Sequence, residues 1–61
     1  MDLTLDIDRR QIYAERQAWA QIKLDGTIIF EALVYDNPEN PAEQNIVNLF
    51  AHRLREALER D

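Results

Sequence analysis

The fold is decided by the stretch AQIKLDGTIIFEA, residues 20–32, in which Asp25-Gly26 separates two runs rich in apolar residues. Asp-Gly in this setting is a strong signal for a β-hairpin, because glycine readily adopts the positive φ that a tight turn requires. The run after the turn, residues 27–35, is rich in β-branched and aromatic residues, which favour strands. The sequence therefore predicts two antiparallel strands joined at Asp25-Gly26.

The length of the hairpin loop determines which side chains share a face of the sheet. A three-residue loop with Gly26 in a bulge position pairs Lys23 with Thr27 and Trp19 with Glu31. A two-residue turn would instead mix polar and apolar side chains on each face. We therefore adopt the three-residue loop, whose core face consists of the even-numbered residues Ile12, Ala14, Ala18, Ala20, Ile22, Ile28, Phe30, Ala32 and Val34.

Two strands are predicted before the turn, and the second of them is the first strand of the hairpin. Residues 2–8 carry Leu3, Leu5 and Ile7 at every second position, which is typical of a strand with one buried face. Residues 12–24 fit a strand whose alternation only Arg16 interrupts, although residues 14–20 also have good helix propensity. The hairpin signal that follows favours the strand.

A helix is predicted over residues 41–59. Asn40 is a favourable N-cap, Pro41 suits the first helical position, and Glu43 stands three residues after the cap. The apolar stripe consists of Ile46, Val47, Phe50, Leu54, Ala57 and Leu58, widened by Leu49 and Ala51. We expect a single small α+β domain over residues 1–61. It is a three-stranded antiparallel β-meander followed by one long C-terminal α-helix packed on one sheet face (βββα), in a dimer.

Charge limits the classes of partner. Twelve acidic and seven basic residues give the 61-residue chain a net charge of −5, which argues against a sequence-independent grip on nucleic acid and against an anionic membrane surface. A basic protein surface is the better electrostatic partner. The chain contains no Cys, so no disulfide can form, and no apolar segment at its start has the pattern of a signal peptide. We therefore expect a cytoplasmic protein.

Residues that perform catalysis are nearly absent. The chain has neither Ser nor Cys as a nucleophile, and its one glycine, Gly26, cannot form a glycine-rich phosphate loop. The one imidazole, His52, should lie on the exposed side of the helix beside Glu56. Asp6 and Asp8 share a strand face that we expect to be solvated. We predict that the protein is not an enzyme and binds neither a cofactor nor a metal ion.

One helix cannot cover both faces of the sheet, so the face of odd-numbered residues is predicted to meet solvent or another molecule. Aromatic and apolar side chains beside charged ones are typical of an interface core with a polar rim. A small chain without a covalent cross-link also needs additional buried area, which a second copy or a target would supply. The predicted contact residues, including an acidic stretch for electrostatic steering, are Tyr13, Trp19, Ile29, Glu31, Leu33, Tyr35, Asp36 and Glu39.

The leading hypothesis is a non-enzymatic protein-binding module that acts as a homodimer. Small acidic chains of this composition are the usual form of phage or mobile-element inhibitors and of small bacterial regulators. A second hypothesis is nucleic-acid binding through Arg9, Arg10, Arg16 and Lys23 with the strand aromatics. In layout alone, the predicted meander and helix resemble the dimeric single-strand-binding modules of transcription coactivators. Two further hypotheses are mimicry of DNA by the carboxylates and a role as a structural subunit of a virion or another assembly.

Overall fold

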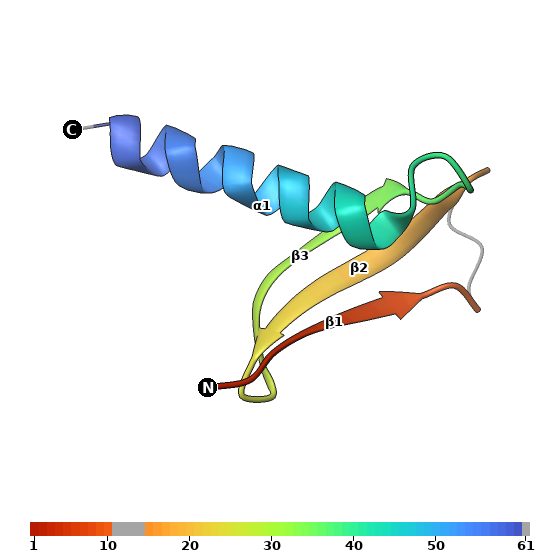
Figure 1. Ribbon diagram of the computed structural model, residues 1–61, viewed down its shortest axis with the longest axis horizontal. Coiled ribbons are helices and arrows are strands. Elements are labelled where there is room, and N and C mark those ends of the chain that lie inside the picture. The colour runs from red at the N-terminus through yellow and green to blue at the C-terminus, as the bar shows by residue number, and fades with distance from the viewer. Residues whose placement is uncertain (11–14, 61) are drawn as a thin grey trace.

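The computed structural model describes residues 1–10 and 15–60. The three strands form one antiparallel sheet in the order β1-β2-β3, and the helix lies on one side of it (Figure 1). This arrangement confirms the predicted βββα fold. Its elements are β1 (Leu3–Asp8), β2 (Gln17–Leu24), β3 (Thr27–Tyr35) and α1 (Ala42–Glu59).

The predicted bounds differ from the observed ones chiefly at β2. Residues 12–14 of the predicted strand lie outside the described residues, and Glu15 and Arg16 form a turn. The backbone of Arg16 has a φ of 58°, which is left-handed and cannot continue a strand. Consequently β2 begins at Gln17, whereas β3 has the predicted bounds.

The hairpin turn is shorter than predicted. Leu24 lies opposite Thr27, which leaves Asp25 and Gly26 as a two-residue turn. Both turn residues have positive φ, 51° and 83°, as a type I′ turn requires. The predicted three-residue loop and the predicted pair Lys23–Thr27 are therefore wrong. The type I′ turn is favoured because its twist matches that of the flanking strands.

A β-bulge follows the turn and compensates for the shorter loop. Lys23 lies opposite Ile28, but the next residue, Ile22, lies opposite Phe30, so Ile29 is the extra residue. One extra residue shifts the register by one position. The even-numbered residues of β2 and β3 consequently share one face from Ile22 onward, as predicted. A two-residue turn followed by a bulge produces this register, in place of the predicted three-residue loop.

The corrected register moves two side chains. Trp19 lies opposite Leu33 rather than opposite Glu31. Ile28, predicted in the core, lies opposite Lys23 and is 43% exposed. Because residues that lie directly opposite one another point to the same side of a sheet, Ile28 shares the side of Lys23 and not that of the core.

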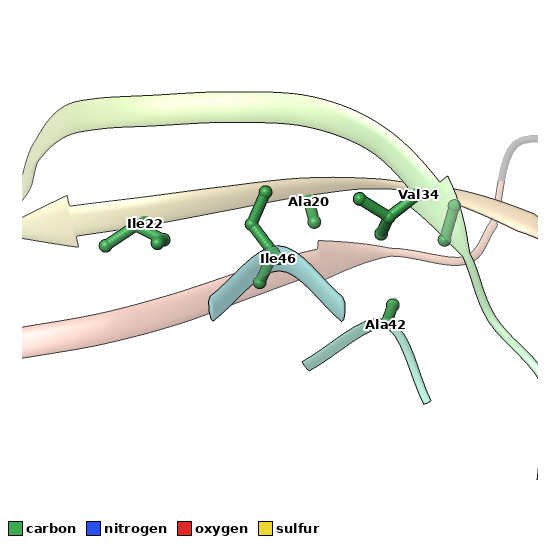
Figure 2. Close-up of a cluster of buried hydrophobic side chains, with 6 residues drawn as sticks. Ala20, Ile22, Val34, Ala42 and Ile46 are labelled. Carbon is green, nitrogen blue, oxygen red and sulfur yellow. The ribbon is translucent and has the colours of Figure 1, made fainter. Parts of the chain in front are cut away.

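The core lies between α1 and the even-numbered face of β2 and β3. Ile46 is fully buried against it, and the rings of Phe30 and Phe50 pack with centroids 5.3 Å apart. Three of the six core side chains are alanines, which allow the helix to approach the sheet closely. The buried residues, five of which are labelled in Figure 2, are Ala18, Ala20, Ile22, Val34, Ala42 and Ile46.

The core is smaller than the apolar pattern predicts. In Figure 1, α1 diverges from the sheet towards its C-terminal end. Leu54 and Leu58 are therefore 50% and 73% exposed. On the helix-facing side of β1, Leu3 and Leu5 are also exposed. The predictions that the whole helix stripe and the apolar side of the first strand are buried are wrong, because the sheet twists away from a straight helix.

The first turn of α1 is capped by Asp36, which lies outside the predicted capping sequence of residues 40–43. The N-cap residue is Pro41, whose side chain makes no capping bond, so the predicted Asn40 cap is wrong. Instead, the backbone N–H of Ala42 donates to Oδ1 of Asp36 at 3.1 Å. The side chain of Asn45 donates to the backbone oxygen of Asn40 at 3.0 Å, which ties the connecting loop to the first turns of the helix.

Candidate functional site

No element of the described residues covers the side of the sheet opposite α1, and we call this side the open sheet face. Strand alternation places one row of three side chains across it, Asp8, Trp19 and Leu33. The neighbouring row contains Asp6, Gln21 and Glu31. The side chains that strand pairing places on this face are Thr4, Asp6, Asp8, Gln17, Trp19, Gln21, Lys23, Ile28, Glu31, Leu33 and Tyr35.

The Trp19 side chain is held in place on this face. Its indole Nε1–H donates to Oε1 of Glu31 at 3.1 Å, and Nε2 of Gln21 donates to the same oxygen at 3.3 Å. The residue itself is half-buried. An aromatic ring with a satisfied N–H loses little conformational entropy on binding, which suits it to anchor an interface.

Exposed apolar side chains extend from Trp19 along β3. Leu33 is 41% exposed directly opposite the tryptophan, and Tyr35 is 63% exposed one row further on. Ile29, at the bulge towards the other end of the strand, is 43% exposed. The structure therefore brings Trp19, Glu31 and Leu33 together as predicted, with Tyr35 beside them. Tyr13 lies outside the described residues.

Carboxylates border the same face on β1. Oδ2 of Asp6 accepts from Nζ of Lys23 at 3.0 Å, and Oδ1 of Asp8 accepts from the backbone N–H of Arg10 at 3.0 Å. A hollow opens beside the indole, between β1 and β2. It is lined by Asp6, Ile7, Asp8, Arg9, Arg10, Trp19 and Gln21. The lining therefore places two carboxylates and two guanidinium groups beside the aromatic ring.

The predicted contact residues Asp36 and Glu39 lie elsewhere. They line a second hollow beside the connection between β3 and α1, and this hollow shares no residue with the one at Trp19. Its lining consists of Arg16, Asp36, Asn37, Pro38, Glu39 and Asn40. The backbone N–H of Glu39 donates to Oδ1 of Asn37 at 3.1 Å, within a turn of the connecting loop.

Asp36 belongs to an ion-pair cluster that joins three elements. Nε of Arg9, just after β1, donates to Oδ2 of Asp36 at 2.7 Å, and Nη2 donates to Oδ1 at 3.2 Å. The same Nη2 donates to Oε1 of Glu43 in the first turn of α1 at 2.6 Å. The sequence pattern does not predict this role of Arg9, because residues 27 and 34 positions apart carry no local signal of contact.

The cluster changes the pKa of both carboxyl groups. The hydrogen bonds from Arg9 hold the pKa of Asp36 below its usual 3.8, with the Ala42 N–H as a second cause. Arg9 likewise lowers the pKa of Glu43 below its usual 4.5. Both groups are therefore ionised in the folded chain at neutral pH. Since the side chains of Arg9 and Glu43 are 48% and 46% exposed, water screens part of their attraction.

The one histidine of the chain lies on the surface of α1. As predicted, His52 is exposed, and its Nε2 lies 3.4 Å from Oε1 of Glu56.

Within residues 1–10 and 15–60, no three side chains of His, Asp or Glu are grouped as metal ligands. No helix in the described part of the chain has the length and apolar character needed to cross a bilayer. Comparisons with protein-family models, curated proteins and solved structures gave no match.

Proposed function

We propose that the chain is a non-enzymatic protein-binding module that docks its open sheet face on a protein with a basic surface. The observation that supports this best is the Trp19 ring, fixed by Glu31, beside exposed Leu33 on a sheet face that the chain's own helix leaves uncovered. By occupying a surface of its target, such a module acts as an inhibitor or small regulator, the role that its size and composition also favour.

The apolar part of the face supplies the centre of the contact. Interface energy concentrates in a few aromatic and apolar side chains surrounded by residues that exclude water. Trp19, Leu33 and Tyr35 are adjacent on the open sheet face and have this composition. Because the indole N–H is already bonded to Glu31, burying the ring leaves its N–H satisfied.

The charged part of the face supports a basic target. The hollow at Trp19 is lined by two carboxylates and two guanidinium groups, so its lining is neutral. The acidic character belongs to the face as a whole, where Asp6, Asp8 and Glu31 stand against Lys23 on the described strands. The net charge of −5 steers a basic target towards the chain from a distance.

The alternative of nucleic-acid binding has weaker support. Of the four basic residues that would carry it, Arg9 is paired with Asp36 and Glu43, and Lys23 is paired with Asp6. Cations paired with carboxylates are less available to neutralise phosphates. We therefore treat nucleic-acid binding as an outcome for the experiment to exclude.

The test compares two variants that each add one negative charge. Leu33→Glu alters the centre of the open sheet face, whereas Asn48→Glu alters an exposed helix position away from the sheet. The wild-type chain is used to capture a partner from its source cell, and the purified pair is then titrated. Trp19, the chain's one tryptophan, gives a fluorescence signal on this face. We expect Leu33→Glu to weaken the partner's affinity at least tenfold, about 1.4 kcal/mol, and Asn48→Glu to leave it unchanged.

Two results would overturn the proposal. One is an equal loss of affinity in both variants, or in neither, while circular dichroism shows both folded. The other is salt-sensitive binding of a single-stranded oligonucleotide that falls on Arg10→Ala, because that result would assign the open sheet face to nucleic acid.

A further inference from the structure

We infer that the second half of α1 is a dimerisation surface, on which the same segment of a second copy packs in antiparallel orientation. This surface is separate from the open sheet face, so the inference does not depend on the proposed function. It rests on four exposed or half-buried apolar side chains, which we call the 47–58 stripe. They are Val47, Ala51, Leu54 and Leu58.

The spacing of the stripe fits helix–helix packing. Its members are separated by four, three and four residues, which is the repeat of a seam between two packed helices. Val47, Leu54 and Leu58 are 46%, 50% and 73% exposed. They lie beside, and not within, the row through Ile46 and Phe50 that faces the sheet. The described part of the chain therefore leaves a continuous apolar seam largely exposed.

The spacing also makes the stripe complementary to itself. If two copies pack antiparallel about the midpoint of the stripe, Val47 lies opposite Leu58 of the second copy and Ala51 lies opposite Leu54. Each large side chain at one end meets a large one, and the small alanine accommodates Leu54 at the centre. A two-fold interface requires this self-matching, in which the same patch serves both partners.

The chain exposes more surface than is expected for a folded monomer of its mass, which is consistent with burial of part of that surface by a second chain. The chain exposes 4960 Å², whereas a folded monomer of 7.2 kDa is expected to expose about 4,100 Å². The excess is about 860 Å², close to the roughly 800 Å² that each partner buries in an interface of standard size. Figure 1 shows part of its origin, since the C-terminal half of the helix extends away from the sheet.

The distribution of charge favours a second copy at this surface over a basic target. Residues 44–61 carry three Arg and three acidic residues, so their net charge is zero, and the whole excess of −5 resides in residues 1–43. Two identical acidic chains repel each other except where they are locally neutral. The 47–58 stripe lies in the neutral segment, where two copies can approach without that repulsion.

Cross-linking tests the pairing directly, because the chain contains no native cysteine. Three variants are compared under mild oxidation: Val47→Cys, Leu58→Cys and the double variant. We expect the double variant to form covalent dimers and neither single variant to do so. In the antiparallel pair, the two copies of Val47 lie about 16 Å apart along the helix, too far for a disulfide.

Sedimentation of the untagged full chain at micromolar concentration supplies the second measurement. We expect about twice the monomer mass for the wild type and for Asn48→Glu, and the monomer mass for Leu54→Glu. Circular dichroism checks that each variant is folded. A folded wild type that sediments as a monomer would overturn the inference. So would efficient cross-linking of either single cysteine variant, which indicates a parallel pair.

Discussion

At the scale of single residues, Asp36 combines two contacts that hold the helix to the sheet. One carboxylate oxygen accepts from the first backbone N–H of α1, and both oxygens accept from Arg9 at the end of β1. A carboxylate at a helix N-terminus also interacts favourably with the helix dipole. Asp36 thus performs the capping task that the sequence assigns to Asn40, from four residues further back in the chain.

Replacing Asp36 should therefore lower stability and weaken its pH dependence. We expect Asp36→Ala to reduce the free energy of unfolding by about 1–2 kcal/mol at neutral pH, as loss of a helix cap does. In the wild type, the pKa of Asp36 and of Glu43 is lower in the folded chain than the usual 3.8 and 4.5. Their contribution is present above those usual values and is lost as the pH falls through the folded ones.

Urea denaturation from neutral pH to pH 3 measures this dependence. The wild type should lose stability as the pH falls below about 4.5, and Asp36→Ala should lose less over the same range. Asp36→Asn retains an oxygen that can cap the helix, so it should be more stable than Asp36→Ala at neutral pH. Glu39→Ala removes an exposed carboxylate from the same loop and is the control. Identical pH profiles for wild type and Asp36→Ala would contradict this role of the ion-pair cluster.

At the scale of elements, local signals predicted the strands and the helix better than the contacts between them. Asp25-Gly26 and the β-branched run after it predicted the hairpin, and the bounds of β3 are correct. The register was wrong because nothing local to Ile29 distinguishes a bulge from a longer loop. Both solutions place Ile22 on the core face, so the alternation of side chains cannot decide between them.

The candidate site was predictable to the same degree. Alternation alone places Trp19 and Leu33 on the face opposite the helix, and the structure confirms that placement. The predicted register already placed Trp19 next to Glu31 as a directly opposite pair, whereas in the structure the indole reaches Glu31 as a diagonal neighbour. Arg9 and Asp36 meet only because the ends of β1 and β3 flank the same strand, which is a property of the whole sheet.

The bulge predicts a difference between two single-residue deletions. Deleting Ile29 should leave a regular hairpin with the same two-residue turn and the same faces, and change the free energy of unfolding by only about 1 kcal/mol. Deleting Leu33 should move Val34 out of the core and onto the open sheet face, because a one-residue shift inverts the alternation. That variant should lose cooperative unfolding.

Circular dichroism and urea titrations of the two deletion variants make the comparison. Each variant lacks one apolar residue of β3, so the two differ only in the position of the deletion. A difference between their unfolding transitions therefore reports on the bulge itself. Equal loss of the cooperative transition in both variants would contradict the placement of the extra residue at Ile29. A cooperative transition in the Leu33 deletion would contradict the assignment of faces.

At the scale of the whole molecule, the helix and the sheet of residues 1–10 and 15–60 give a core of six buried residues, half of them alanine. Burial of this extent supplies a few kcal/mol of net stability at most, since conformational entropy opposes nearly all of it. The two uncovered surfaces have different properties. The open sheet face is acidic and aromatic, whereas the 47–58 stripe is apolar within a neutral segment. The proposed dimer contact and the proposed target contact therefore use separate surfaces.

If the chain folds as a dimer through the 47–58 stripe, its thermal stability must depend on its concentration. Association favours the folded state by mass action. A tenfold rise in concentration increases the free energy of unfolding by about 1.4 kcal/mol per dimer, or half of that per chain. For a chain of this length, we expect the unfolding midpoint to rise by about 3–5 °C per tenfold increase. Scanning calorimetry or circular dichroism over two decades of concentration resolves such a shift. Leu54→Glu should remove the dependence and lower the midpoint, while Asn48→Glu should behave as the wild type does. A wild-type midpoint that does not change with concentration would mean that the folded chain is stable alone and that the 47–58 stripe remains exposed in solution.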